Sequence, residues 1–165
     1  MAEFNAAIGK GDNFSLAWTP SGTRLLSAGS ASDPMIREWD TSTWQQVGDP
    51  WSGHTNIIFA LAVNSTGTLI ASVSSDAQVR LWQLSDQRAI AIFKASDEIY
   101  CATFSVDGRY ILCGGRDGNV TEWAVPEYVA LEDTPRAQAS DVISSSLILP
   151  GTDDEQGEVP LVSIS

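Results

Sequence analysis

Three residues near the middle of the chain carry the side chains of a serine hydrolase: His54, the only histidine, with Ser72 and Asp76. A histidine oriented by a carboxylate can take the proton of a serine hydroxyl and make that oxygen nucleophilic. Such chemistry also needs an exposed serine on a strand-to-helix turn, with hydrogen-bond donors for an oxyanion beside it. The residues around Ser72 predict no such turn. We therefore predict a structural role for the three residues and no enzymatic activity.

Composition narrows the classes of function further. The 165 residues include 21 acidic and 9 Lys or Arg side chains, so the net charge is −12. This charge disfavours binding to nucleic acid and to anionic membranes. A hydrophobic content of 43% predicts a packed core, but no apolar run reaches the ~20 residues of a membrane span. No phosphate-binding loop or metal-ligand cluster is present, so we expect neither cofactor nor metal.

The N-terminal sequence and the cysteine content predict an intracellular, cytoplasmic location. The first ten residues include an acid and lack the apolar stretch of a signal peptide. Only two cysteines, Cys101 and Cys113, are present, too few for a secreted disulfide scaffold. They lie symmetrically about Asp107, which places them opposite each other on a hairpin. We expect two small buried thiols, with a disulfide or a metal pair as the less favoured alternative.

Residues 14–40, 59–84 and 100–125 repeat one pattern with a period of about forty residues. A turn glycine, an aspartate and a tryptophan six residues after the aspartate recur in each: Gly22, Asp33 and Trp39; Gly67, Asp76 and Trp82; Gly108, Asp117 and Trp123. Short runs of alternating apolar and polar residues between turns predict β-strands. A weaker fourth strand is expected at about 44–47, 89–93 and 128–131. Each repeat thus predicts a four-stranded antiparallel sheet.

These landmarks resemble the WD repeat, with Gly53-His54 similar to its Gly-His pair and Trp39-Asp40 to its terminal Trp-Asp. The resemblance implies an all-β fold, a partial WD-repeat β-propeller of three four-stranded antiparallel blades. The expected divisions are a lead-in (1–12), three blades (13–48, 49–94 and 95–131) and an acidic tail (132–165). The tail is expected to be a linker or a remnant strand.

The resemblance also implies a structural tetrad of His54, Ser72, Asp76 and Trp82, in which each buried polar group finds a hydrogen-bond partner. The other repeats keep only the pairs Asp33 with Trp39 and Asp117 with Trp123. In the first repeat the serine position is expected at Ala28. In the third repeat, Ala95 stands in place of the histidine and Cys113 in place of the serine.

Three blades are fewer than the four to eight that close a propeller ring, so open edges and apolar faces are expected. The chain is then a fragment or a shortened relative of a longer propeller, a half-ring closed by a second copy, or a piece that docks on another partner. The expected function is a non-catalytic protein–protein interaction scaffold with unidentified protein partners. The alternative is a sensor or regulatory segment of a larger nucleotide-binding signalling protein.

The resemblance implies that partners bind on the face formed by the loops before the first and third strands of each blade. Aromatic residues recurring at one position suggest a patch there, although they also suit packing between blades. Trp51 is likewise interpreted either as blade packing or as a partner contact. The candidate residues are Asp12, Phe14, Ser32, Trp51, Ile57, Phe59, Ser75, Glu98, Tyr100 and Arg116.

Overall fold

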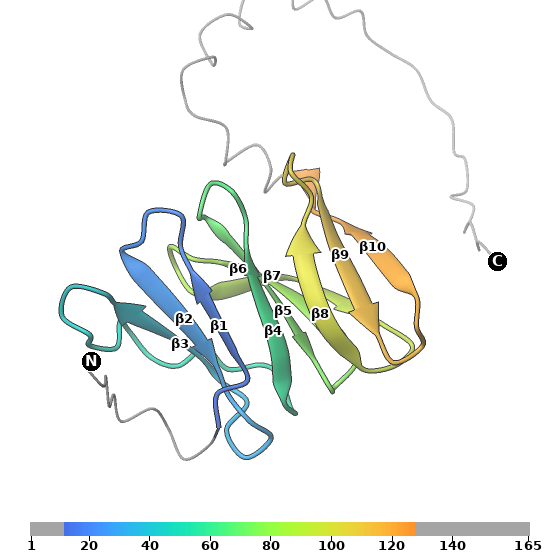
Figure 1. Ribbon diagram of the computed structural model, residues 1–165, viewed down its shortest axis with the longest axis horizontal. Helices are drawn as coiled ribbons and strands as arrows, with labels where there is room; N and C mark the ends of the chain where they lie inside the picture. The colour runs from blue at the N-terminus through green and yellow to red at the C-terminus, as the bar shows by residue number, and fades with distance from the viewer. Residues whose placement is uncertain (1–11, 128–165) are drawn as a thin grey trace, which may run out of the picture. The chain divides into compact units, whose positions relative to one another are not determined.

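The computed structural model describes residues 12–127, which form ten strands in three antiparallel sheets (Figure 1). The first sheet consists of β1 (Ser15–Trp18), β2 (Arg24–Ala28) and β3 (Ile36–Asp40). The second consists of β4 (Ile58–Val63), β5 (Leu69–Ser74), β6 (Gln78–Gln83) and β7 (Arg88–Lys94). The third consists of β8 (Ile99–Phe104), β9 (Tyr110–Gly115) and β10 (Val120–Ala124). The predicted all-β class, with one antiparallel sheet in each repeat, is confirmed. None of residues 12–127 forms a helix that could span a membrane.

The same kind of turn joins the first two strands of every sheet. Gly22, Gly67 and Gly108 adopt positive φ angles of 70°, 76° and 71° in these turns. A side chain at such a position would strain the backbone, which is why glycine recurs there. In each turn the glycine N–H donates to a carbonyl oxygen three residues earlier. The repeated glycines of the sequence therefore mark equivalent hairpins.

The predicted fourth strands have different outcomes in the three repeats. The expected strand at 89–93 lies within β7, whereas the one at 128–131 lies outside the described residues, as does the tail at 132–165. The expected strand at 44–47 is reduced to the isolated bridges Trp39↔Gln46 and Ile36↔Trp51. Pro50 lacks a backbone N–H, and Gly48 takes a positive φ of 67°, so this segment cannot continue a regular ladder beside β3.

The three sheets lie side by side, with their first strands β1, β4 and β8 as neighbours (Figure 1). One buried cluster joins the first sheet to the second and includes Leu26, Ile36 and Ile70. A second cluster, which includes Leu81 and Ile111, joins the second sheet to the third. Strand β5 is buried along its whole length. The middle sheet is therefore the one packed on both faces, and its polar side chains need partners inside the protein.

Candidate functional site

The middle sheet holds a buried hydrogen-bond network of four side chains. His54 lies in the loop before β4, Ser72 on β5, Asp76 in the turn after β5 and Trp82 on β6. The His54 Nδ1 atom lies 2.8 Å from Asp76 Oδ2, and the Nε2 atom lies 2.7 Å from Ser72 Oγ. The Trp82 indole N–H donates to the same Ser72 oxygen at 2.8 Å. The network connects one loop, one turn and two strands.

The electrostatics of the pair fix the proton positions in this network. Burial lowers the pKa of His54 against the opposing effect of Asp76, so the ring is neutral at neutral pH. Burial alone would raise the pKa of Asp76, but hydrogen bonds from the Thr55 backbone and from His54 outweigh it and lower that pKa. Asp76 is therefore ionised and accepts from His54 Nδ1–H. The Nε2 atom is then left to accept the Ser72 hydroxyl proton.

This geometry is unsuited to nucleophilic catalysis at Ser72. The residue is 0% exposed, and its oxygen already serves both the histidine and the tryptophan. A substrate carbonyl could reach it only by disrupting the network. Among residues 12–127, no group of three or more His, Cys, Asp or Glu side chains is placed to hold a metal ion.

The first sheet contains a reduced form of the network, and its serine differs from the one expected. Trp39 Nε1 donates to Ser27 Oγ at 2.9 Å, so the serine position is Ser27 and not Ala28. Ser27 pairs with Arg37 across β2 and β3, just as Ser72 pairs with Arg80 across β5 and β6. The carboxylate of Asp33 forms an ion pair with Arg37 at 2.9 Å.

The third sheet has the tryptophan without its acceptor. Trp123 Nε1 is buried and has no hydrogen-bond partner in the described part of the chain. The buried thiol of Cys113 occupies the serine position, and sulfur is a weak acceptor. The Asp117 carboxylate accepts from the backbone N–H and the side-chain amide of Asn119, at 3.0 and 3.1 Å. Ala95 offers no ring at the histidine position.

The two cysteines are not opposite each other, contrary to the expectation. The register of the hairpin, which pairs Phe104 with Ile111 next to the turn, places Gly114 opposite Cys101 and Ala102 opposite Cys113. Both are free thiols, but only Cys113 is buried as expected; Cys101 is exposed, so the expectation is wrong for that residue. Burial raises the pKa of the Cys113 thiol to about 12, which leaves it protonated and unreactive.

An aromatic row runs across the starts of all three first strands. The Phe14 and Phe59 rings contact edge-to-face at a centroid distance of 6.3 Å, and Phe59 and Tyr100 do so at 5.1 Å. Phe14 is 47% exposed and Tyr100 42%, while Phe59 is half-buried between them. The row therefore packs between neighbouring sheets and also presents apolar surface to solvent.

Polar groups lie beside one end of this row. Glu98 accepts from the Ser75 hydroxyl at 2.6 Å and from the Tyr100 hydroxyl at 3.0 Å, and Arg116 Nη1 lies 3.4 Å from its carboxylate. The hydrogen bond from Ser75, then that from Tyr100 and the charge of Arg116, lower the pKa of Glu98. The hydrogen bond to Glu98 raises the pKa of Tyr100. The tyrosine ring is thereby held in a fixed orientation beside Phe59.

The remaining candidate residues are less uniform. Asp12 and Ser32 are exposed and Ile57 is half-buried. Trp51 is only 3% exposed, with its ring 5.8 Å from that of Trp82, so it packs inside the protein and does not belong to an exposed face. Its Nε1 atom has no hydrogen-bond partner within residues 12–127.

One polar cluster was missed by the sequence reasoning. Glu38 is 5% exposed and pairs with Arg24 Nε at 3.0 Å, while Gln87, in the turn between β6 and β7, donates to its other oxygen at 3.1 Å. Arg24 Nη1 also contacts Asp40 at 2.6 Å. The sequence contained a signal for this cluster. Side chains alternate between the two faces of β3, so Glu38 lies on the same side as the buried Ile36 and should be buried too.

Comparison with known proteins bears out the resemblance seen in the repeats. The family model described as "WD domain, G-beta repeat" matches residues 11–40, 44–83 and 87–123, which are more than half of the chain. Periodic tryptophan protein 2 homolog from Schizosaccharomyces pombe is 31% identical over 113 residues, which are 68% of this chain and 13% of that relative.

Two further relatives show the same partial coverage. Small ribosomal subunit protein RACK1 from Neurospora crassa is 28% identical over 103 residues, covering 62% of this chain and 32% of the relative. Serine-threonine kinase receptor-associated protein from Homo sapiens is 27% identical over 99 residues, covering 60% of this chain and 27% of the relative. The chain therefore spans about a third or less of the length of each of these three relatives.

Proposed function

The chain belongs to the WD-repeat family, and from that premise we propose that it is a non-catalytic module that binds a protein partner on the aromatic row of Phe14, Phe59 and Tyr100. The observation that carries the proposal is the row itself, which crosses all three sheets and keeps two rings more than 40% exposed. Exposed aromatic rings held in fixed positions are typical of binding hot spots, because little side-chain entropy is lost when a partner covers them.

The surroundings of the row define the partner's chemistry. The net charge of −12 favours a basic partner segment at long range. At short range, the Glu98 carboxylate beside Tyr100 can accept from a lysine or arginine that displaces the exposed Arg116. The names of two relatives support a role in binding other proteins: one is a small ribosomal subunit protein and the other a kinase receptor-associated protein.

The test is a quantitative comparison of proteins retained from a cell extract by the wild-type chain and by variants. Phe14→Ala with Tyr100→Ala removes both exposed rings without emptying the core. Val106→Ala is the matched control, since Val106 is 99% exposed on a different turn. A specific partner is retained by the wild type and the control and is lost with the double variant. Equal retention by all three would refute the proposed face.

A second proposal concerns the outer faces of the first and third sheets. Leu16 and Trp18 of β1 are 62% and 54% exposed, and Val120 of β10 is 76% exposed. We propose that these faces pack against further blades, which are supplied by a second copy or by additional propeller sequence. Light scattering distinguishes the two sources: a particle of about twice 17.7 kDa that Leu16→Glu converts to the monomer supports the second copy. A monomeric wild-type chain refutes it.

A further inference from the structure

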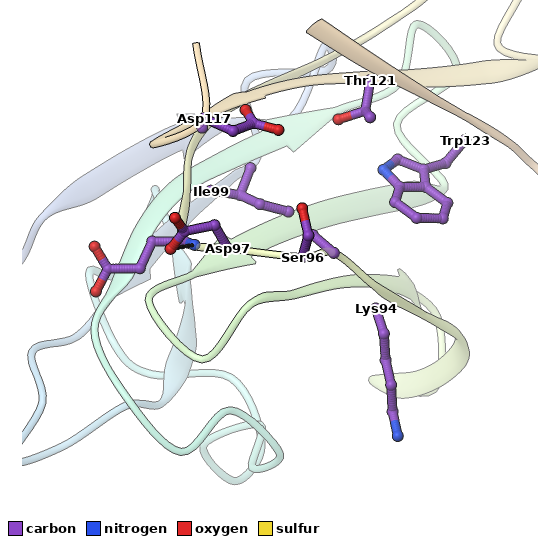
Figure 2. Close-up of a pocket in the computed structure, with 10 residues that line it drawn as sticks. Lys94, Ser96, Asp97, Ile99, Asp117, Thr121 and Trp123 are labelled. Atoms are coloured by element: carbon purple, nitrogen blue, oxygen red, sulfur yellow. Dashed lines mark hydrogen bonds between the residues drawn. The ribbon is translucent and has the colours of Figure 1, made fainter. Parts of the chain in front are cut away.

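The third sheet contains a hollow beside its unpartnered tryptophan. The hollow has a volume of about 210 Å³ and is lined by Lys94 at the end of β7, by the loop from Ala95 to Glu98 and by residues of β10. Its walls include Ala95, which stands where the middle repeat has His54, together with Asp117 and Trp123. Figure 2 shows Asp117, Ser96, Thr121 and Trp123 arranged around this space. About 10–15 Å³ suffices for one water, so the hollow can admit a small molecule or a side chain.

The polar groups around the hollow require both a donor and an acceptor from its occupant. Trp123 Nε1 is buried and has no acceptor, whereas Trp39 and Trp82 donate to serine oxygens at 2.9 and 2.8 Å. A buried N–H without a partner is costly, so an acceptor supplied to it is stabilising. At another wall the Asp117 carboxylate accepts two hydrogen bonds from Asn119 and retains capacity for another donor.

The charges around the hollow restrict the occupant further. Asp97, Glu98 and Asp117 line it together with one cation, Lys94, so the excess of negative charge repels an anion such as phosphate. A simple ammonium ion would satisfy a carboxylate but would offer no acceptor to Trp123. A neutral ring with an N–H on one side and an unprotonated nitrogen on the other meets both demands. In the middle sheet the His54 ring bridges Asp76 and Ser72 in this manner, at 2.8 and 2.7 Å.

We propose that the hollow of the third sheet binds an imidazole ring, either free or as the histidine side chain of a partner peptide. The ring donates its N–H to the Asp117 carboxylate, and its other nitrogen supplies the acceptor that Trp123 Nε1 lacks. Ser96 and Thr121, which carry hydroxyl groups, also line the hollow (Figure 2). In the second repeat the His54 ring acts on the indole through the Ser72 hydroxyl, whereas in the third repeat, where Cys113 replaces that serine, the ligand nitrogen accepts from the indole directly.

The indole N–H signals of the full chain in a proton–nitrogen NMR spectrum provide the test. The chain has six tryptophans, and Trp123→Phe identifies the signal of interest by its disappearance. Imidazole is titrated at pH 8, where its ring is mostly neutral. The expected result is a saturable shift of the Trp123 signal. The Trp51 signal serves as an internal control, because its Nε1 is also buried and unpartnered but the residue does not line this hollow.

Two variants make the test specific. Ala95→His places a ring in the hollow, so the response of Trp123 to imidazole is expected to disappear while the Trp51 and Trp82 signals report an intact fold. Asp117→Ala is expected to weaken binding at least fivefold. The proposal is overturned if the Trp123 signal shows no saturable shift, which would mean that the hollow holds water only, or if Ala95→His responds like the wild type.

A second titration identifies the source of the ring. N-acetyl-histidine amide presents imidazole on a peptide backbone, and a shift at Trp123 with both ligands supports docking of a histidine side chain. A shift with imidazole alone supports the same site and assigns it to a free heterocycle. A variant that lacks the aromatic row, with Phe14 and Tyr100 replaced by alanine, should still bind imidazole, because neither residue lines the hollow.

Discussion

Replacing Ser72 by alanine tests the buried network most directly. The hydroxyl is 0% exposed and serves two partners, Trp82 Nε1 at 2.8 Å and His54 Nε2 at 2.7 Å. Alanine leaves both groups buried without a partner, and each orphaned group costs about 1–3 kcal/mol. We expect the free energy of unfolding to fall by about 2–5 kcal/mol, a large share of the ~5–15 kcal/mol typical of a domain.

The first sheet provides a matched control for this substitution. Ser27 occupies the same strand position and is 2% exposed, but its hydroxyl accepts from a single partner, Trp39 Nε1, at 2.9 Å. Ser27→Ala therefore leaves one buried group without this hydrogen bond, with an expected cost of about 1–3 kcal/mol, roughly half the loss expected for Ser72→Ala. The two variants lose the same hydroxyl and differ only in how many partners that hydroxyl had.

Urea unfolding followed by tryptophan fluorescence measures both changes. An unchanged slope with a lower midpoint shows that the native state lost stability without a change in the surface exposed on unfolding. A loss below about 0.5 kcal/mol for Ser72→Ala, comparable to a neutral surface substitution, would refute the network. A loss for Ser27→Ala equal to or larger than that for Ser72→Ala would refute the argument from the number of partners.

Four further substitutions test the environments of the other polar groups. Because burial lowers the pKa of His54, the unfolded chain gains a proton just below pH 6.5 while the folded chain does not. The free energy of unfolding should therefore fall toward pH 5 by up to about 1.4 kcal/mol per pH unit. His54→Gln should remove this slope in melts recorded as a function of pH. Trp51→Phe removes an unpartnered N–H and should change stability by less than about 1 kcal/mol, whereas Trp82→Phe, which loses a hydrogen bond, should cost more in the same urea assay. Cys113→Ser offers Trp123 Nε1 an oxygen acceptor and should raise the melting temperature in calorimetry; an unchanged or lower value would show that the indole does not reach it.

The sequence predicted the repeat framework well because its signals are local. Turn glycines mark a backbone conformation that other residues rarely adopt, and alternating apolar residues mark strands that are buried on one face. Both kinds of signal act within a few residues, so Gly22, Gly67 and Gly108 fall in equivalent turns of the structure. No regular strand follows β3, because Pro50 lacks a backbone N–H and Gly48 takes a positive φ, and neither feature changes the alternating pattern of the sequence.

The details that depend on register were less predictable. The serine of the first repeat is Ser27 and not the expected Ala28, and its distance from the tryptophan differs between repeats: Ser27 and Trp39 are twelve residues apart, whereas Ser72 and Trp82 are ten. The turn between β2 and β3 absorbs the two extra residues. The cysteines are not opposite each other because the β8–β9 hairpin is centred between Asp107 and Gly108 and not on Asp107, so each cysteine faces the neighbour of the other. A shift of one residue turns a side chain to the other face of a sheet.

The three repeats separate two roles of the recurring aspartate. Asp76 accepts from the Gln78 backbone N–H at 3.0 Å as well as from the histidine, and Asp117 accepts from the Asn119 backbone N–H at the same distance. Asp33 instead forms an ion pair across its own longer turn. The aspartate thus stabilises the turn between the second and third strands whether or not a histidine is present. Because that local role does not depend on the histidine, the third sheet can form its turn while leaving the ring position unfilled. An unfilled polar position inside a formed blade is what allows a ligand ring to be accommodated there.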